Sequence, residues 1–310
     1  MRILTPQAFQ RAKSYIFDQG RELEQRFFET YFLGGPPNPV LAALAVYQNE
    51  DGGFGQTLEP DLRTSASSAV ATQHAFQLCR EIKAPSTEAM VQRGIAYLLR
   101  TYDPAHGAWP IIPPAAEDAP HAPWWNYADS AQNFGGFLAN PRAALVGYLY
   151  DYRELVPADF LAQVTNALVT HLEVAPQKME MHDLQCYVNL AETVRLSPAL
   201  KNRIQEKIGQ IVRHSVELDS TQWSNYGLPP LGVVKAPDHF LAASIPAATL
   251  AANLDFLLDQ QQSDGAWAPT WQWSFVDEAA WQAAEQEWKS YLTLANLKLL
   301  HAFGRVASTS

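Results

Sequence analysis

Two carboxylates in a predicted loop are the first candidates for chemistry in this 310-residue sequence. Glu59 and Asp61 follow a glycine-rich segment and precede a predicted helix that begins near residues 65–68. A carboxyl group at the entrance to a helix can face a ligand and exchange a proton with it. We predict Glu59 and Asp61 as catalytic acids and Arg63 as a substrate contact. The structural alternative is that Asp61 caps the helix and Arg63 pairs with Glu59.

The adjacent residues His182 and Asp183 are a second candidate acid–base pair, since imidazole titrates near neutral pH. In a helix such a pair can also be purely structural. Asp183, Cys186 and His239 offer the carboxylate, thiolate and imidazole ligands of a catalytic zinc site. The spacing of these three residues matches that of known zinc sites only loosely, and a lone helical cysteine is usually buried. We predict no metal and no cofactor, and zinc at these three residues stays open.

Aromatic residues outside the regular helices form the third candidate group. The segments 103–140 and 219–238 are rich in proline and lack helical periodicity, and loops of this length usually line or close a site. Indole faces stabilise carbocations and stack on sugar rings. A linker is the alternative for 103–140, and its role as a lid stays open. The predicted substrate contacts are His121, Trp124, Trp125, Trp223, Trp271 and Trp273.

Helices must position all of these groups. Apolar residues recur at three- and four-residue spacing along most of the chain, and no segment alternates for long enough to form a sheet. Helix-start signals at Pro157 and at Ser197-Pro198 precede two such runs. The sequence therefore predicts an all-α fold, which we expect to be a single domain over residues 1–310.

One turn motif recurs at the ends of three predicted helices, within residues 44–54, 97–109 and 256–267. Each copy ends in a glycine, a small residue and an aromatic residue. Recurring units of this kind imply stacked helical hairpins. The three endings are Gly52-Gly53-Phe54, Gly107-Ala108-Trp109 and Gly265-Ala266-Trp267.

The third copy, with Phe256-Leu257, Gln261 and Gly265-Ala266-Trp267, resembles the QW repeat of the terpenoid cyclase and protein prenyltransferase superfamily. The resemblance implies an α/α toroid of paired helices. It also implies a terpenoid-cyclase-like enzyme that acts by acid–base chemistry, in an aromatic cavity, on a largely apolar small molecule such as an isoprenoid.

The sequence departs from that superfamily in having neither a DxDD nor a DDxxD motif, so the chemistry that those motifs perform is in doubt. Whether the chain is an enzyme therefore stays open. One alternative is a carbohydrate-active α/α-barrel hydrolase or lyase, which needs paired carboxylates. The other is a toroid that binds a small molecule or a partner without catalysis.

Charge, cysteine content and hydropathy limit the classes of partner and the compartment that we expect. The formal net charge is −10 without a run of Lys or Arg, which argues against nucleic-acid binding. Cys79 and Cys186 lie far apart, as in proteins of reducing compartments. The N-terminus does not look like a signal peptide, and polar residues interrupt the apolar stretch 240–258. We expect a cytoplasmic protein without a membrane span, with a small-molecule ligand and an oligomeric state left open.

Overall fold

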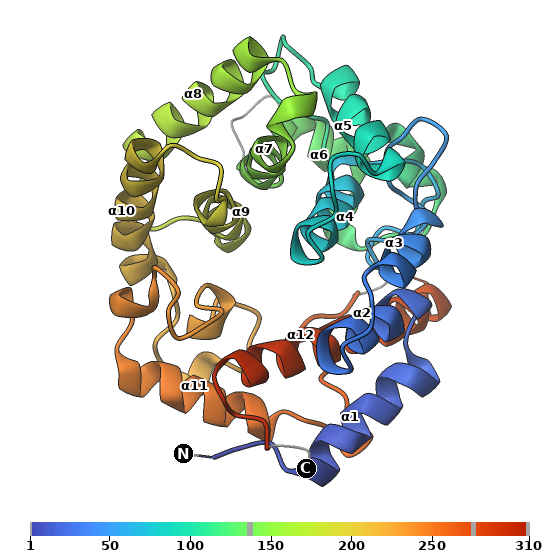
Figure 1. Cartoon of the computed structure of the whole chain (residues 1–310), viewed down its shortest axis with the longest axis vertical. Coiled ribbons are helices and arrows are strands. Elements are labelled where there is room, and N and C mark those ends of the chain that lie inside the picture. Colours follow the sequence, from blue (N-terminus) through green and yellow to red (C-terminus); the bar gives the residue numbers. More distant parts are fainter. Residues whose placement is uncertain (1, 135–138, 274–276, 308–310) are drawn as a thin grey trace. The chain divides into compact units, whose positions relative to one another are not determined.

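The computed structural model describes residues 2–134, 139–273 and 277–307. Within these ranges the chain forms twelve α-helices, short 3-10 turns and isolated β-bridges but no strand, so the prediction of an all-α fold is confirmed there (Figure 1). None of the helices in the described ranges combines the length and apolar character that a membrane crossing requires. The α-helices are α1 (Pro6–Gln19), α2 (Glu22–Phe32), α3 (Asn38–Ala45), α4 (Ala69–Glu81), α5 (Ala89–Thr101), α6 (Tyr127–Phe134), α7 (Arg142–Asp151), α8 (Ala158–Val174), α9 (Met181–Glu192), α10 (Pro198–Ser215), α11 (Ala247–Asp259) and α12 (Glu278–Ala302).

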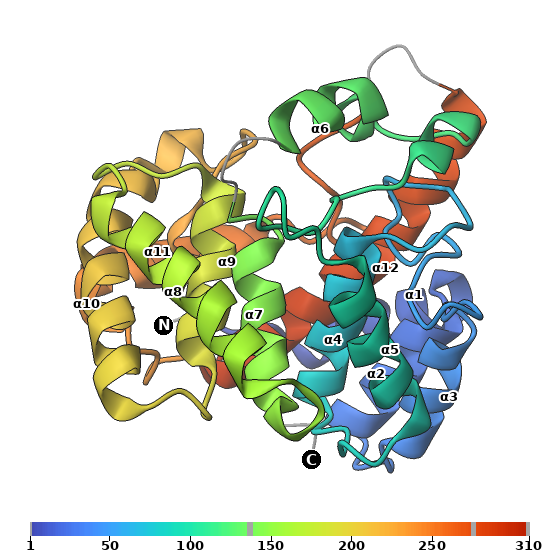
Figure 2. The same ribbon diagram turned by 90° about the horizontal axis from the view of Figure 1, so that it is seen from above.

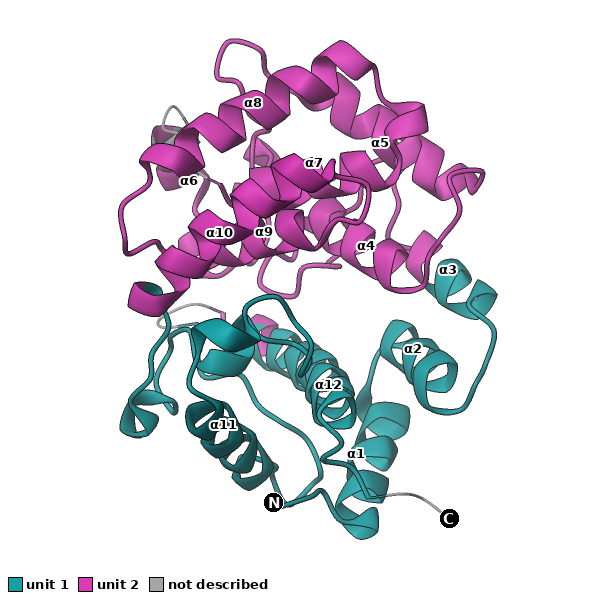
Figure 3. Cartoon of the chain, turned by 60° about the vertical axis from the view of Figure 1, so that its left-hand side comes forward, with its two compact units in different colours: residues 1–43, 215–273, 281–310 teal, residues 44–214, 274–280 magenta. Residues whose placement is uncertain are grey.

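The chain divides into two compact units (Figure 3). Unit 1 comprises residues 1–43, 215–273 and 281–310, and unit 2 comprises residues 44–214 and 274–280. Unit 1 therefore joins the two ends of the chain, while unit 2 holds α4 to α10. The single domain expected over 1–310 stays a prediction, and each unit is described by itself.

Unit 2 is built around α7, which packs against α4, α8 and α9. Figures 1 and 2 both show α7 beside α9. The segment Arg142–Leu149 is buried throughout, as expected of a helix that has neighbours on all sides. Segment 103–140 also belongs to unit 2 and contains the 3-10 turns Pro114–Asp118 and Pro123–Trp125 as well as α6, with residues 135–138 lying outside the described ranges.

A polar network joins the C-terminal ends of three helices of unit 2. Arg80 of α4 donates hydrogen bonds to Asp151 Oδ2 of α7 at 2.5 Å and to Thr193 Oγ1, just after α9, at 2.8 Å. It also donates to Asn189 Oδ1 of α9 at 2.9 Å and lies 4.4 Å from the ring centroid of Tyr148. Burial raises the pKa of Asp151 although the guanidinium opposes the shift. The network thus fixes α4, α7 and α9 to one another.

Unit 1 holds the N- and C-terminal segments together. The backbone nitrogen of Leu4 donates to Arg305 O at 2.7 Å, and that of Ala307 donates to Leu4 O at 3.1 Å. Arg305 Nη1 donates to Asp255 Oδ1 of α11 at 2.6 Å, and Arg2 forms a second ion pair with Asp259. Both ends of the chain are therefore anchored to α11.

In two copies of the recurring turn the side-chain nitrogen of the glutamine makes matching hydrogen bonds, and Gln48 Oε1 in addition accepts one from Arg93. In unit 2, Gln48 Nε2 donates to Gly52 O and to Met90 O of α5, each at 2.9 Å. In unit 1, Gln261 Nε2 donates to Gly265 O at 2.9 Å and to Ala8 O of α1 at 3.0 Å. Each amide thus closes its own turn and binds it to a neighbouring helix.

The remaining positions of the two turns also correspond. Phe54 N donates to Thr72 Oγ1 of α4 at 3.1 Å, and Trp267 N donates to Thr293 Oγ1 of α12 at 3.0 Å. Gly52 and Gly265 have φ values of 85° and 97°, which favour glycine. A Cβ at either position would also lie 2.5 Å from a helix carbonyl oxygen, that of Arg93 or Arg11. Glycine is therefore required at both turns for conformation and for space.

Candidate functional site

The loop between the first turn and α4 buries two predicted acids. Gln56 and Thr57 adopt left-handed φ values of 54° and 62°, which bend the chain back towards residues 64 and 65. Further along, Leu62 N donates to Glu59 O at 3.0 Å, which closes a second tight turn. The outcome is that Glu59 is only 6% exposed and Asp61 only 3% exposed.

A second segment docks on this loop through its backbone. Ala122 N donates to Asp61 O at 2.8 Å, Arg63 N donates to Pro120 O at 3.1 Å, and Leu62 and His121 form an isolated β-bridge. The structure thereby brings together six of the predicted site residues: Glu59, Asp61, Arg63, His121, Trp124 and Trp125. We call these six residues and His74 of α4 the Glu59 group.

An apolar cluster underlies the Glu59 group. Its buried members are Leu62, Val70, Ile112 and Ala116, and the partly buried side chains of Ile111, Trp125 and Tyr127 pack against it. The neighbouring Trp124 is 47% exposed. The group therefore combines two buried carboxyl groups with a packed aliphatic core and with indole rings that are partly exposed.

His74 of α4 is the member of the group that sequence reasoning missed. Its Nδ1 lies 3.3 Å from Glu59 Oε2, and its side chain is 14% exposed. The only sequence signal is that His74 stands one helical turn after Val70, so both project from the same face of α4. An imidazole in contact with a buried carboxylate can orient it and exchange a proton with it.

His182 and Asp183 lie at the start of α9 and contact other partners. Glu180 caps the helix by accepting hydrogen bonds from His182 N at 2.7 Å and Asp183 N at 3.0 Å. The His182 ring also contacts Glu180, at 2.7 Å between Nδ1 and Oε1. Asp183 Oδ1 accepts from Asn140 N at 2.7 Å, and burial raises the pKa of Asp183. These contacts match the structural alternative for the pair.

The three potential zinc ligands are divided between the units, because Asp183 and Cys186 belong to unit 2 and His239 belongs to unit 1. The Cys186 thiol donates to Asn140 Oδ1 at 3.6 Å, and burial raises its pKa. Within the described ranges, no three His, Cys, Asp or Glu side chains are placed to hold a metal ion.

The other three predicted tryptophan contacts belong to unit 1, where they pack against aromatic neighbours. The Trp223 ring lies 5.7 Å from that of Phe256, and its Nε1 donates to Glu217 O at 2.8 Å. Segment 219–238, which contains Trp223, includes the 3-10 turns Ser220–Gln222 and Pro230–Gly232. The other ring pairs are Trp271 with Trp288 at 5.1 Å and Trp273 with Trp281 at 5.9 Å.

The Glu59 group is thus the candidate site, because it places an imidazole 3.3 Å from a buried carboxyl group and next to partly exposed indole rings. No protein-family model matches this chain, and no curated protein matches its sequence.

Proposed function

We propose that this protein is a terpenoid-cyclase-like enzyme that transfers protons on a largely apolar small molecule such as an isoprenoid. One observation carries the proposal: the buried carboxylate of Glu59 lies 3.3 Å from the imidazole of His74. The partly exposed side chains beside it, those of Ile111, Trp124 and Trp125, would contact a hydrocarbon ligand.

In the proposed reaction, the Glu59 carboxyl group donates its proton to one carbon of an alkene, and a C–H bond forms. The neighbouring carbon becomes a cation, for which indole faces such as those of Trp124 and Trp125 are suited. His74 accepts a proton from an adjacent carbon of the cation, which gives an isomerised or cyclised alkene. The imidazolium then transfers this proton to the Glu59 carboxylate, which restores both groups to their starting state.

The proposal extends to the fold, for which we infer an α/α toroid of the terpenoid cyclase and prenyltransferase type. Support comes from the recurring turns, in which the side-chain nitrogens of Gln48 and Gln261 each donate to a carbonyl oxygen near the start of a neighbouring helix, α5 and α1 respectively. The two cysteines, both buried and unbridged, are compatible with the cytoplasmic location that we propose.

A non-catalytic binding protein is the second candidate. The contacts of His182 and Asp183 favour it, because Glu180 caps their helix through both backbone nitrogens and Asp183 Oδ1 accepts a hydrogen bond from Asn140 N. Under this reading the Glu59 group would bind its ligand without changing it.

A solvent-isotope experiment separates the two candidates. The purified protein is incubated with linear isoprenoid alkenes in D₂O, and the products are analysed by gas chromatography and mass spectrometry. We expect deuterium in the product with the unaltered protein, and a loss of at least about 100-fold in Glu59→Gln. Glu206→Gln, on the exposed face of α10, is the matched control and should stay fully active. Equal rates in Glu59→Gln, or binding without deuterium uptake, would refute the proposed chemistry.

A further inference from the structure

The indole N–H of Trp125 is a buried donor within the Glu59 group. Its Nε1 atom is covered by the surrounding protein, and no acceptor in the part of the chain that the structure describes forms a hydrogen bond with it. Leaving a buried donor in this state costs on the order of 1–3 kcal/mol. Because native proteins satisfy most of their buried donors, this N–H points to a partner that comes from outside the chain.

Other tryptophans of the chain show the usual arrangement. In three of them a backbone carbonyl oxygen accepts the indole N–H at 2.7–2.8 Å. The pairs are Trp109 with Leu98, Trp223 with Glu217, and Trp267 with Leu257. Trp125 departs from this arrangement.

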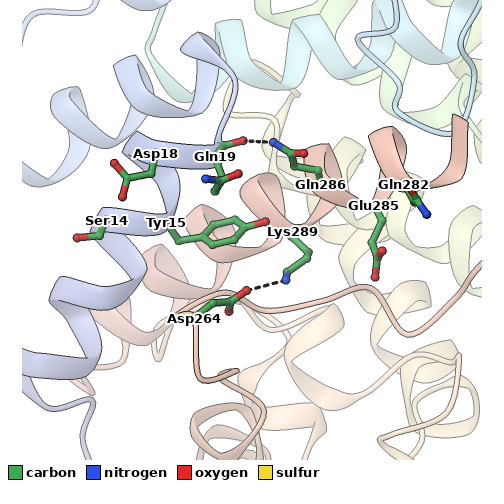
Figure 4. A pocket seen from close by; sticks show the side chains of 9 residues that line it. All are labelled: Ser14, Tyr15, Asp18, Gln19, Asp264, Gln282, Glu285, Gln286 and Lys289. Atoms are coloured by element: carbon green, nitrogen blue, oxygen red, sulfur yellow. Dashed lines mark hydrogen bonds and ion pairs between the residues drawn. The ribbon is translucent and has the colours of Figure 1, made fainter. Parts of the chain in front are cut away.

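Two polar donors of a groove in unit 1 also have acceptors within the protein. Figure 4 shows this groove, which α1, α12 and the turn at Asp264 line. Lys289 Nζ donates to Asp264 Oδ2 at 2.8 Å, and Gln286 Nε2 donates to Gln19 O at 3.0 Å. The unsatisfied N–H of Trp125 therefore distinguishes the Glu59 group from this groove.

The backbone of Trp125 is fixed beside the candidate acids. Trp125 N donates to Ala122 O at 2.9 Å, and Ala122 N donates to Asp61 O at 2.8 Å. The Trp125 ring packs against the apolar cluster that contains Val70, and Val70 and His74 project from the same face of α4. The ring is also partly exposed, so a ligand on it would lie next to the face of α4 that carries His74.

The chemistry of this donor limits the kind of partner. An indole N–H donates and cannot accept, so the partner must present an acceptor atom. The carboxyl groups of Glu59 and Asp61 and the net charge of −10 disfavour an anionic acceptor such as a diphosphate. A neutral oxygen suits the site better. Because the N–H lies at the edge of the ring, an oxygen bound there leaves the indole face to the cationic carbon.

We infer that the substrate is a neutral oxygenated isoprenoid, an alcohol or a carbonyl compound, whose oxygen accepts a hydrogen bond from Trp125 Nε1. This inference rests on the proposed function, because it names the substrate class of the same site. Nε1 is covered whereas part of the ring is exposed, so the indole turns about its Cβ–Cγ bond when the oxygen binds. The hydrogen bond then fixes the alkene relative to Glu59.

Nuclear magnetic resonance of the nine ¹⁵N-labelled indole groups tests the inference on the full chain. Farnesol is compared with farnesene, a hydrocarbon with the same carbon skeleton, and the Trp125 signal is the one that Trp125→Phe lacks. We expect farnesol to shift the Trp125 signal and to bind about 3- to 10-fold more tightly than farnesene, as one neutral hydrogen bond allows. In Trp125→Phe the two ligands should bind with equal affinity.

Trp109→Phe is the matched control, because it makes the same substitution in unit 2 at an indole whose acceptor is Leu98 O. It should keep the preference for farnesol, and circular dichroism verifies that both variants are folded. Equal affinity of the unaltered protein for farnesol and farnesene, with the Trp125 signal unmoved, would overturn this inference and leave the proposed function in place. Tighter binding of farnesyl diphosphate than of farnesol would exclude a neutral substrate. If neither farnesol nor farnesene binds, both the inference and the proposed function fail.

Discussion

At the scale of single residues, Glu59 carries a buried carboxyl group that needs a hydrogen-bonding partner. Burying a polar group without such a partner costs on the order of 1–3 kcal/mol. Glu59 is 6% exposed, and the imidazole of His74 lies within 3.3 Å of it. His74 therefore has two roles that substitutions can separate, one in stability and one in proton transfer.

Replacing His74 in two ways tests those roles. His74→Gln keeps an amide donor for Glu59 but cannot take up a proton, so we expect a stable protein with solvent-deuterium uptake reduced about 100-fold. His74→Ala leaves the carboxylate without this partner, and the free energy of unfolding should fall by about 2 kcal/mol. Urea unfolding and the D₂O assay measure the two effects. Full activity in His74→Gln would exclude the imidazole from the proton path.

At the scale of elements, the Arg80 network should govern how α4, α7 and α9 hold together. Arg80→Ala leaves the mostly buried Asp151 without its cation, and we expect a loss of about 3 kcal/mol at pH 7. The pKa of Asp151 is already raised by burial, and removing Arg80 raises it further. Protonation relieves the uncompensated charge, so the loss should shrink as the pH falls from 7 to 4.

Urea unfolding of Arg80→Ala at the two pH values measures this dependence. Arg153→Ala, an exposed arginine between α7 and α8, is the control and should change stability by less than about 0.5 kcal/mol. A loss that stays constant with pH would show that Asp151 is not the group left uncompensated.

The two recurring turns should be energetically equivalent. Gln48→Ala and Gln261→Ala each remove one amide that donates to two carbonyl oxygens, so we expect each to cost about 2 kcal/mol. Gln48→Ala also removes an exposed hydrogen bond from Arg93, which should add less than about 0.5 kcal/mol. Gln92→Ala, which removes a single exposed contact to Ser86 O, should cost much less. Thermal unfolding monitored by circular dichroism compares the three. A large difference between Gln48→Ala and Gln261→Ala would contradict the equivalence.

Helices and turns could be predicted from the sequence because their determinants are local. Apolar spacing revealed the all-α fold, and the Gln–Gly–aromatic pattern located turns whose hydrogen bonds prove alike. His74 was missed because its partner Glu59 lies in the loop before α4. No sequence pattern pairs a loop residue with a residue inside the helix that follows. Tryptophan is a residue type that often contacts ligands, which is why Trp271 and Trp273 were predicted. In the structure their rings pack against those of Trp288 and Trp281 within unit 1.

At the scale of the whole molecule, the chain ends belong to one unit through contacts that no local pattern encodes. Residues 1–43 meet the segments 215–273 and 281–310 because Leu4 bonds with the backbone at 305–307 and Arg305 pairs with Asp255. Arg2 and Asp259 add an exposed ion pair, which contributes little by comparison. The stability of unit 1 should therefore depend on Arg305.

Hydrogen exchange measured by mass spectrometry can follow the two units separately. Arg305→Ala removes donors to Asp255 and to Arg2 O, so we expect faster exchange in peptides from α1 and α11. Peptides from α7 and α9 should exchange as in the unaltered protein. Lys201→Ala on α10 serves as a control and should alter neither set. Faster exchange throughout the chain would mean that the two units unfold together.

The central claim is that the Glu59 group binds an apolar substrate, and photoaffinity labelling tests it most directly. The purified protein is irradiated with a diazirine-bearing isoprenoid alkene, and the labelled peptides are identified by mass spectrometry. We predict labelling within residues 58–76 and 111–127, with Trp124 or Trp125 modified, and competition by the unmodified alkene. Labelling confined to other segments, or labelling that the alkene does not displace, would contradict the assignment.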